Sequence, residues 1–156
     1  MMPGKAVGWW CACLLLLVSQ APPSTADSLT IPFEYAEGRG SILLRVRVND
    51  KPALLIFDTG SSHTILRPEL LGMKTSELVP TEASTGGGFM GDAVGREVTL
   101  QIGNRKGSKR RVAVMDLSQV LSVYHEKIDG ILGLDFLFEF RRVTINVTEK
   151  TIIFAK

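Results

Sequence analysis

The chain has 156 residues and a formal net charge of +2, and 45% of its residues are hydrophobic and 22% charged. This length accommodates one domain with its own core and not obviously two. The nearly neutral charge balance gives no indication of a nucleic-acid-binding protein.

The first 26 residues have the layout of a secretory signal peptide. Lys5 stands in a short basic start, residues 6–18 form an apolar run, and Ser24 and Ala26 lie at positions suited to cleavage. We therefore predict a signal peptide over residues 1–26 and a mature domain over residues 27–156 that is secreted or periplasmic.

The apolar run is too short to span a bilayer, which takes ~20 residues, so we expect no stable membrane span after cleavage. Retention of the uncleaved segment as an anchor stays open. Both cysteines, Cys11 and Cys13, lie in this segment. The mature domain therefore has no thiol or disulfide, and it tolerates an oxidising compartment without depending on one.

The mature region begins with alternating apolar and polar residues. Residues 41–58 predict two strands joined by a tight turn at Asn49 and Asp50, which tolerate positive φ. Asp58 then lies at the end of the second strand, directly after the apolar run LLIF. A carboxylate beside a buried run is costly unless its charge is used, so Asp58 is the first candidate for a functional residue.

The remaining elements predict a mostly β chain. Strands are expected near residues 98–102 and 112–115, and a final hairpin crosses residues 148–150. Helical patterns are confined to residues 67–72 and 134–140. The class is therefore all-β with short helices.

A basic cluster, RKGSKRR, covers residues 105–111. It is interpreted as a solvated turn between two strands, because no aromatic residues are interleaved with it. A contact surface for an acidic partner is the alternative.

Three segments together resemble the single-domain aspartic proteases of the retropepsin-like clan, including its secreted bacterial members. They are FDTGSSHTIL, the glycine-rich STGGGFMGDAVGR, and IDGILGLDFL followed by a hairpin that ends in TIIF. The resemblance implies an all-β retropepsin-like acid protease fold: a closed, barrel-like half with a flap hairpin and one or two short helices.

The resemblance also implies the chemistry. Two carboxylates that share one proton supply both a base for water and an acid for the substrate. The chain has one Asp-Thr-Gly, so Asp58 of a second, identical chain is the expected partner. Thr59 is expected to reach across to the other chain, Gly60 to permit the tight loop, and Ser61 to donate a hydrogen bond to Asp58.

Other residues are assigned supporting roles by the same resemblance. Asp129 and Asp135 are expected to be structural. The floor beneath the catalytic loop is expected to comprise Gly130, Ile131, Leu132 and Gly133, and the flap and substrate-binding residues are Gly86, Gly87, Gly88, Phe89 and Met90.

Competing site chemistries are weaker. The segment GGGFMG fits a dinucleotide-loop formula, but the residues that follow alternate as a strand and do not open a helix. His63 and His125 sit in no metal-ligand spacing, so no metal is expected. His63 is interpreted as structural or exposed.

The sequence therefore predicts an aspartic endopeptidase that acts as a homodimer on peptide or protein substrates, without metal or other cofactor. The terminal segments LTIPFEY and TIIFAK are expected at the dimer interface. Two alternatives are a non-catalytic peptide- or partner-binding module of the same fold and a structural envelope domain.

Overall fold

The computed structural model describes residues 28–79, 83–84, 90–91 and 93–156, so the predicted signal peptide lies outside the described residues. The elements in chain order are β1 (Ser28–Pro32), β2 (Glu34–Tyr35), β3 (Ile42–Val48), β4 (Lys51–Phe57), β5 (Ile65–Leu66), the 3₁₀ helices η2 (Pro68–Leu71) and η3 (Thr75–Glu77), β6 (Ala83–Ser84), β7 (Met90–Gly91), β8 (Ala93–Ile102), β9 (Ser108–Met115), α1 (Ser118–Leu121), β10 (Gly130–Leu132), α2 (Leu134–Leu137), β11 (Arg142–Asn146) and β12 (Thr151–Ala155).

The main sheet closes into a barrel. Its strands follow the order β2-β3-β4-β10-β5-β9-β8, and β8 pairs again with β3, which makes a ring of six strands with β2 added to β3. Two of the pairings, β4 with β10 and β5 with β9, are parallel, whereas the others are antiparallel. The mostly β architecture with short helices confirms the predicted all-β class.

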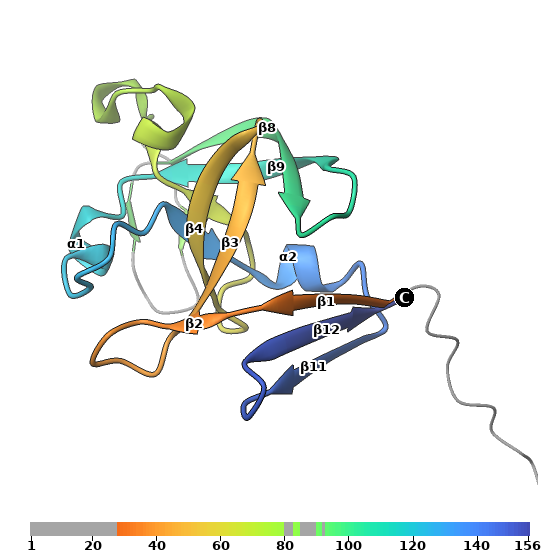
Figure 1. The fold of residues 1–156 in the computed structure, drawn as a ribbon. Coiled ribbons are helices and arrows are strands. Elements are labelled where there is room, and N and C mark those ends of the chain that lie inside the picture. Colours follow the sequence, from red (N-terminus) through yellow and green to blue (C-terminus); the bar gives the residue numbers. More distant parts are fainter. Residues whose placement is uncertain (1–27, 80–82, 85–89, 92) are drawn as a thin grey trace, which may run out of the picture.

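The chain ends form a separate sheet in the order β1-β12-β11. Figure 1 shows this sheet at one side of the barrel, with α2 between the two. Ile152 and Phe154 of β12 are fully buried, and they share one apolar cluster with Phe136 and Leu137 of α2. The helix is therefore held by apolar packing on both sides.

The apolar run before Asp58 reflects burial on both faces of β4. Leu55 and Phe57 point into the larger core cluster, whereas Ile56 belongs to a second cluster beneath α1. A strand covered on both faces has no polar side to alternate with, so it becomes continuously apolar.

Both predicted hairpin turns are present. Asn49 and Asp50 have φ of 47° and 63°, so β3 and β4 are joined by the expected left-handed turn. The second turn, between β11 and β12, contains Lys150 with φ 50°.

Several elements differ from the prediction. The strands β8 and β9 are longer than expected, because each begins earlier and they pair continuously from Ala93 opposite Met115 to Leu100 opposite Ser108. The predicted helix over residues 134–140 ends at Leu137, where the chain turns to place the Arg141 amide on the Ala155 carbonyl. The one-turn helix α1 was not predicted.

The basic cluster is only partly a solvated turn. Its last residues belong to β9, and the Arg110 side chain is only 9% exposed. Arg110 pairs with Glu139, and its guanidinium lies 4.9 Å from the centroid of the Phe136 ring. The prediction was wrong for Arg110 because α2 covers this end of β9.

Phe154 is the centre of the aromatic core, with ring centroids 5.0 Å from Phe140, 5.7 Å from Phe136 and 6.5 Å from Phe57. We expect Phe154→Ala to lower the free energy of unfolding by ~3–5 kcal/mol, because it leaves a cavity among these rings. Urea unfolding at fixed protein concentration measures this change. Val123→Ala, at a 46% exposed position, is the control and should cost less than ~0.5 kcal/mol. Equal costs would contradict the assignment of the core.

Candidate active site

Asp58 lies at the point where β4 leaves the barrel. The parallel strand β10 runs beside β4, with Leu132 opposite Phe57. The Asp58 amide donates to the Leu132 carbonyl at 3.1 Å, which continues this pairing by one residue. The Asp58 side chain is half-buried, so its carboxylate is held by the barrel and still accessible to a ligand.

A glycine fixes the carboxylate from the loop side. The Gly60 amide donates to Asp58 Oδ1 at 2.7 Å. A Cβ at Gly60 would lie only 3.1 Å from the same oxygen, which is tighter than most such contacts. The absence of a side chain at Gly60 therefore lets the loop close on the carboxylate.

Ser61 supports the loop in a different way from the one predicted. Its side chain is buried, and its hydroxyl donates to the His63 carbonyl at 2.7 Å. A hydroxyl has one proton to donate, so the expected hydrogen bond from Ser61 to Asp58 is not formed. His63 itself is exposed, and its Nδ1 lies 2.8 Å from Ser62 Oγ.

The predicted floor residues lie directly beneath the loop. The Leu134 amide donates to the Ser61 carbonyl at 2.8 Å. A Cβ at Gly133 would lie 2.4 Å from the His63 carbonyl oxygen, and one at Gly130 would lie 2.3 Å from the Ile65 carbonyl oxygen. These two glycines are therefore required by close backbone approach.

Between the glycines, Ile131 and Leu132 are buried in different apolar clusters. Ile131 belongs to the cluster beneath α1, and Leu132 to the larger core. The β10 strand thus joins the two parts of the core under Asp58.

Sequence reasoning missed the part played by Thr64. This fully buried side chain donates to Asp135 Oδ1 at 2.7 Å, and its hydroxyl accepts from the Gly133 amide at 3.3 Å. Asp135 Oδ1 also accepts from the Phe136 amide at 2.9 Å. The available signal in the sequence was the position of Thr64, a hydroxyl residue, directly before the buried apolar residues Ile65 and Leu66.

The two further carboxylates near the motif have structural partners. Asp135 bonds Thr64 and the start of α2, as described above. Asp129 Oδ2 accepts from the Leu54 amide at 3.0 Å, and the Asp129 amide donates back to the Leu54 carbonyl at 2.8 Å. These contacts agree with the structural roles expected for both residues.

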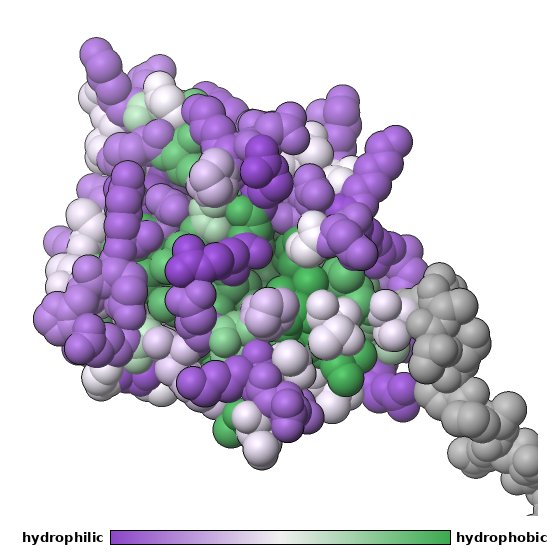
Figure 2. All heavy atoms as spheres, viewed as in Figure 1, coloured by the Kyte–Doolittle hydropathy of each residue, from purple (hydrophilic) through white to green (hydrophobic). Residues whose placement is uncertain are grey.

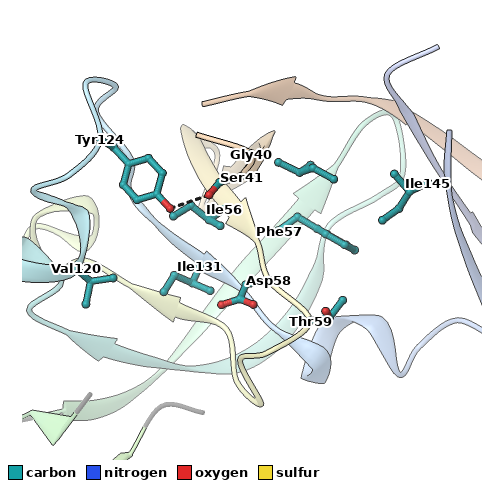
Figure 3. Close-up of a pocket in the computed structure, with 11 residues that line it drawn as sticks. Gly40, Ser41, Ile56, Phe57, Asp58, Thr59, Val120, Tyr124, Ile131 and Ile145 are labelled. Atoms are coloured by element: carbon teal, nitrogen blue, oxygen red, sulfur yellow. Dashed lines mark hydrogen bonds between the residues drawn. The ribbon is translucent and has the colours of Figure 1, made fainter. Parts of the chain in front are cut away.

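Asp58 opens into a cleft of about 410 Å³. Figure 3 shows apolar side chains around the carboxylate and the hydrogen bond of 2.8 Å between Ser41 Oγ and Tyr124 Oη at the rim. The residues that line the cleft are Gly40, Ser41, Ile42, Ile56, Phe57, Asp58, Thr59, Val120, Tyr124, Ile131 and Ile145. Most of the lining was not predicted, because it comes from segments far apart in the sequence.

Two carboxylates in the segments on either side of α1, Asp116 and Glu126, accept hydrogen bonds from backbone amides. The hydroxyl and amide of Ser118 hold the pKa of Asp116 below its usual range. The Glu37 amide, which donates to Glu126 Oε1 at 2.7 Å, lowers the pKa of Glu126 in the same way. Both carboxylates therefore favour their charged forms in the folded chain.

Most of the predicted flap lies outside the described residues. Gly86, Gly87, Gly88 and Phe89 are not among them. Met90 lies in β7, which pairs antiparallel with β6 in a two-stranded ladder. This pairing places Ala83 opposite Gly91 and Ser84 opposite Met90.

The described residues contain neither a metal-binding cluster nor a membrane-spanning helix. No three of their His, Cys, Asp and Glu side chains lie together as a metal site needs. None of the helices in the described part of the chain is long and apolar enough to cross a membrane.

A six-stranded barrel that carries a half-buried aspartate on an Asp-Thr-Gly loop, above a strand that begins with one glycine and is followed directly by another, defines a retropepsin-like aspartic peptidase. The aspartyl protease family model matches residues 44–136, and the chain belongs to this family. The predicted family and fold are confirmed, and the chain is an aspartic-type peptidase.

A solved structure has the same fold. A retropepsin-like aspartic protease from Rickettsia conorii matches with a TM-score of 0.55 and 19% identity, over 81% of this chain and 89% of that one. The EIAV protease complexed with the inhibitor HBY-793 matches with a TM-score of 0.47 and 23% identity, over 68% of this chain and 92% of that one. No curated protein matched the sequence.

We expect Gly133→Ala to lower the free energy of unfolding by about 3 kcal/mol or more, because its Cβ would press on backbone atoms of the catalytic loop. Urea unfolding measures the change. Gly40→Ala is the matched control, since a Cβ there meets nothing within 4 Å, and it should change stability by less than ~0.5 kcal/mol. A Gly133→Ala chain as stable as the control would rule out the close contact.

Proposed function

We propose that the protein is a secreted or periplasmic endopeptidase that acts as a homodimer, with one Asp58 from each chain. The observation that carries this proposal is the position of Asp58, half-buried in an apolar cleft and held by the Gly60 amide on Oδ1. The leader-like residues 1–26 support export.

The chemistry follows from two Asp58 carboxylates at the dimer axis. Two such groups a few ångströms apart share one proton, because both cannot be charged together. The charged one accepts a proton from water, which attacks the peptide carbonyl. The protonated one donates to the carbonyl oxygen, and a proton then passes to the leaving amine.

The two described carboxylates beside the catalytic loop do not supply the second carboxylate for this reaction. Asp129 and Asp135 are occupied by backbone amides and Thr64, so neither is free to pair with Asp58. The sequence has one Asp-Thr-Gly. A second copy of the chain is therefore the source of the partner carboxylate.

Several exposed features suit a two-fold contact. Thr59 is exposed at the tip of the catalytic loop. The terminal sheet leaves outer edges on β1 and β11, and unpaired edges favour pairing with another chain. Phe138, after α2, is 79% exposed, while Ile145 and Val147 in the β11 hairpin are 41% and 62% exposed. Burial of these side chains would stabilise the dimer.

The proposed substrate is an extended peptide. The cleft is lined by apolar side chains such as Ile42, Val120 and Ile131, which suit an apolar substrate side chain beside the scissile bond. The β6–β7 ladder would close over the peptide and bond its backbone, as strands do when they add to an edge.

We expect the chain from Asp27 to cleave a peptide library at some pH between ~3 and ~8, the range over which carboxylates and their coupled pairs titrate. Asp58→Asn should lower kcat/KM at least ~100-fold, because it removes the acid–base group. Mass spectrometry of the cleaved peptides gives both values.

The matched control for this experiment is Asp50→Asn, since asparagine tolerates the positive φ of the turn at Asp50 and the position is exposed. It should retain full activity. A folded wild-type dimer that cleaves nothing at any pH, yet binds peptides in the cleft, would instead support a non-catalytic binding module.

Shared catalysis predicts how activity falls when wild type is mixed with Asp58→Asn. At equal amounts and fixed total concentration, random pairing leaves about one quarter of dimers with two intact sites, so activity should fall to about one quarter of wild type. A chain that is active by itself would retain about one half. The measurement is the initial rate across a series of mixing ratios.

A further inference from the structure

A second cavity lies away from the catalytic cleft, between the β8–β9 hairpin, the end of α2 and the terminal strands. Its volume is about 200 Å³. The lining consists of Leu29, Leu100, Ile102, Arg105, Lys106, Ser108, Phe136, Glu139, Phe140 and Lys156, and none of these residues lines the cleft at Asp58. Figure 1 shows the hairpin above α2 and the C-terminal end.

The floor of this second cavity is apolar. Phe136 and Phe140 lie with ring centroids 5.3 Å apart, and Leu29 and Leu100 complete the surface from two other strands. Figure 2 shows apolar atoms between the β8–β9 hairpin and the terminal sheet, surrounded by hydrophilic side chains. The hollow is smaller than a typical drug-sized site of ~300 Å³ and comparable with the ~150 Å³ that holds a benzene ring. It therefore suits one large apolar side chain.

The rim of the cavity is basic. Arg105, Lys106 and Lys156 line it, and the Arg105 guanidinium lies 5.4 Å from the centroid of the Phe140 ring. The one acidic lining residue, Glu139, is paired with Arg110. No ion pair within the described part of the chain involves the three basic lining residues, so the rim favours an acidic ligand.

Arg110 adds a buried polar atom behind the same wall. Its Nε has no hydrogen-bond partner among the described residues, although the other end of the guanidinium reaches Glu139 and Ser108. Arg110 does not itself line the second cavity, so this N–H is not a contact for a ligand bound there.

We propose that this second cavity binds an acidic peptide segment of a partner protein, with one large apolar side chain in the hollow and flanking carboxylates on Arg105 and Lys106. A nucleic acid fits less well, because Phe136 and Phe140 are only 5% and 9% exposed and so offer little ring face on which a base could stack. The binding does not depend on proteolysis.

The test uses the complete mature chain with Asp58→Asn, so that the probe is not cleaved. The probe is a fluorescently labelled Glu-Glu-Phe-Glu-Glu peptide, and fluorescence anisotropy gives its Kd. Replacing the Phe of the peptide by Ala should weaken binding about tenfold or more, because it removes the apolar side chain from the hollow. Replacing its Glu residues by Lys should have an effect of the same size, because it removes the carboxylates that bind Arg105 and Lys106. A peptide that binds equally well without its Phe would overturn the proposal.

Variants of the protein locate the binding. Arg105→Glu with Lys106→Glu should weaken binding at least about tenfold, and Ser108→Phe should do so without a charge change, by filling the hollow. Lys51→Glu with Lys127→Glu carries the same charge change at exposed positions that do not line the cavity, and it should stay within about twofold. Equal weakening by the two charge-reversed pairs would mean non-specific attraction and overturn the proposal.

Two further outcomes separate this proposal from others. If Arg105→Glu with Lys106→Glu changes the molecular mass measured by ultracentrifugation, the occupant is a second copy of the chain and the peptide proposal fails. Because binding is measured in the Asp58→Asn chain, a protein without any protease activity would leave this result unaffected.

Discussion

The geometry of the site depends on one close backbone contact, where β10 passes beneath the chain that follows Asp58. The contact is possible only because Gly130 and Gly133 have no side chains: a Cβ at either would lie less than 2.5 Å from a carbonyl oxygen of the overlying segment. This close approach allows two hydrogen bonds: the Leu134 amide donates to the Ser61 carbonyl, and the Asp58 amide donates to the Leu132 carbonyl. The catalytic loop is thus fixed at both ends by main-chain hydrogen bonds, which are less easily displaced than side-chain contacts.

A buried polar network reinforces this contact. Thr64 and Asp135 join the segment after the catalytic loop to the start of α2, and the Thr64 hydroxyl and Asp135 Oδ1 each take part in two hydrogen bonds. In a low-dielectric interior such a group stabilises one arrangement, because any alternative leaves a hydrogen-bonding atom unsatisfied. The network also explains why Asp135, which lies beside the catalytic loop in space, has a structural and not a catalytic part.

The short helix α2 contacts both the catalytic loop and the second cavity. Its first residues bond the catalytic loop, whereas Phe136 lies in the wall of the second cavity and packs on Phe154. Only one turn long, it would not be stable alone, and its conformation depends on packing between the barrel and the terminal sheet. The two sites therefore rest on the same aromatic core.

The sequence alone determined the β class, the turn at Asn49 and Asp50, and the position of Asp58 after a buried strand, because these follow from local periodicity and backbone conformation. The glycines beneath Asp58 were expected only from the resemblance to aspartic proteases. The tertiary structure decided which distant side chains meet. It directed the Ser61 hydroxyl to His63, brought Tyr124 and Ile145 to the cleft, and buried Arg110 against α2. Such contacts depend on how strands far apart in the sequence close into a barrel, and no local pattern records that closure.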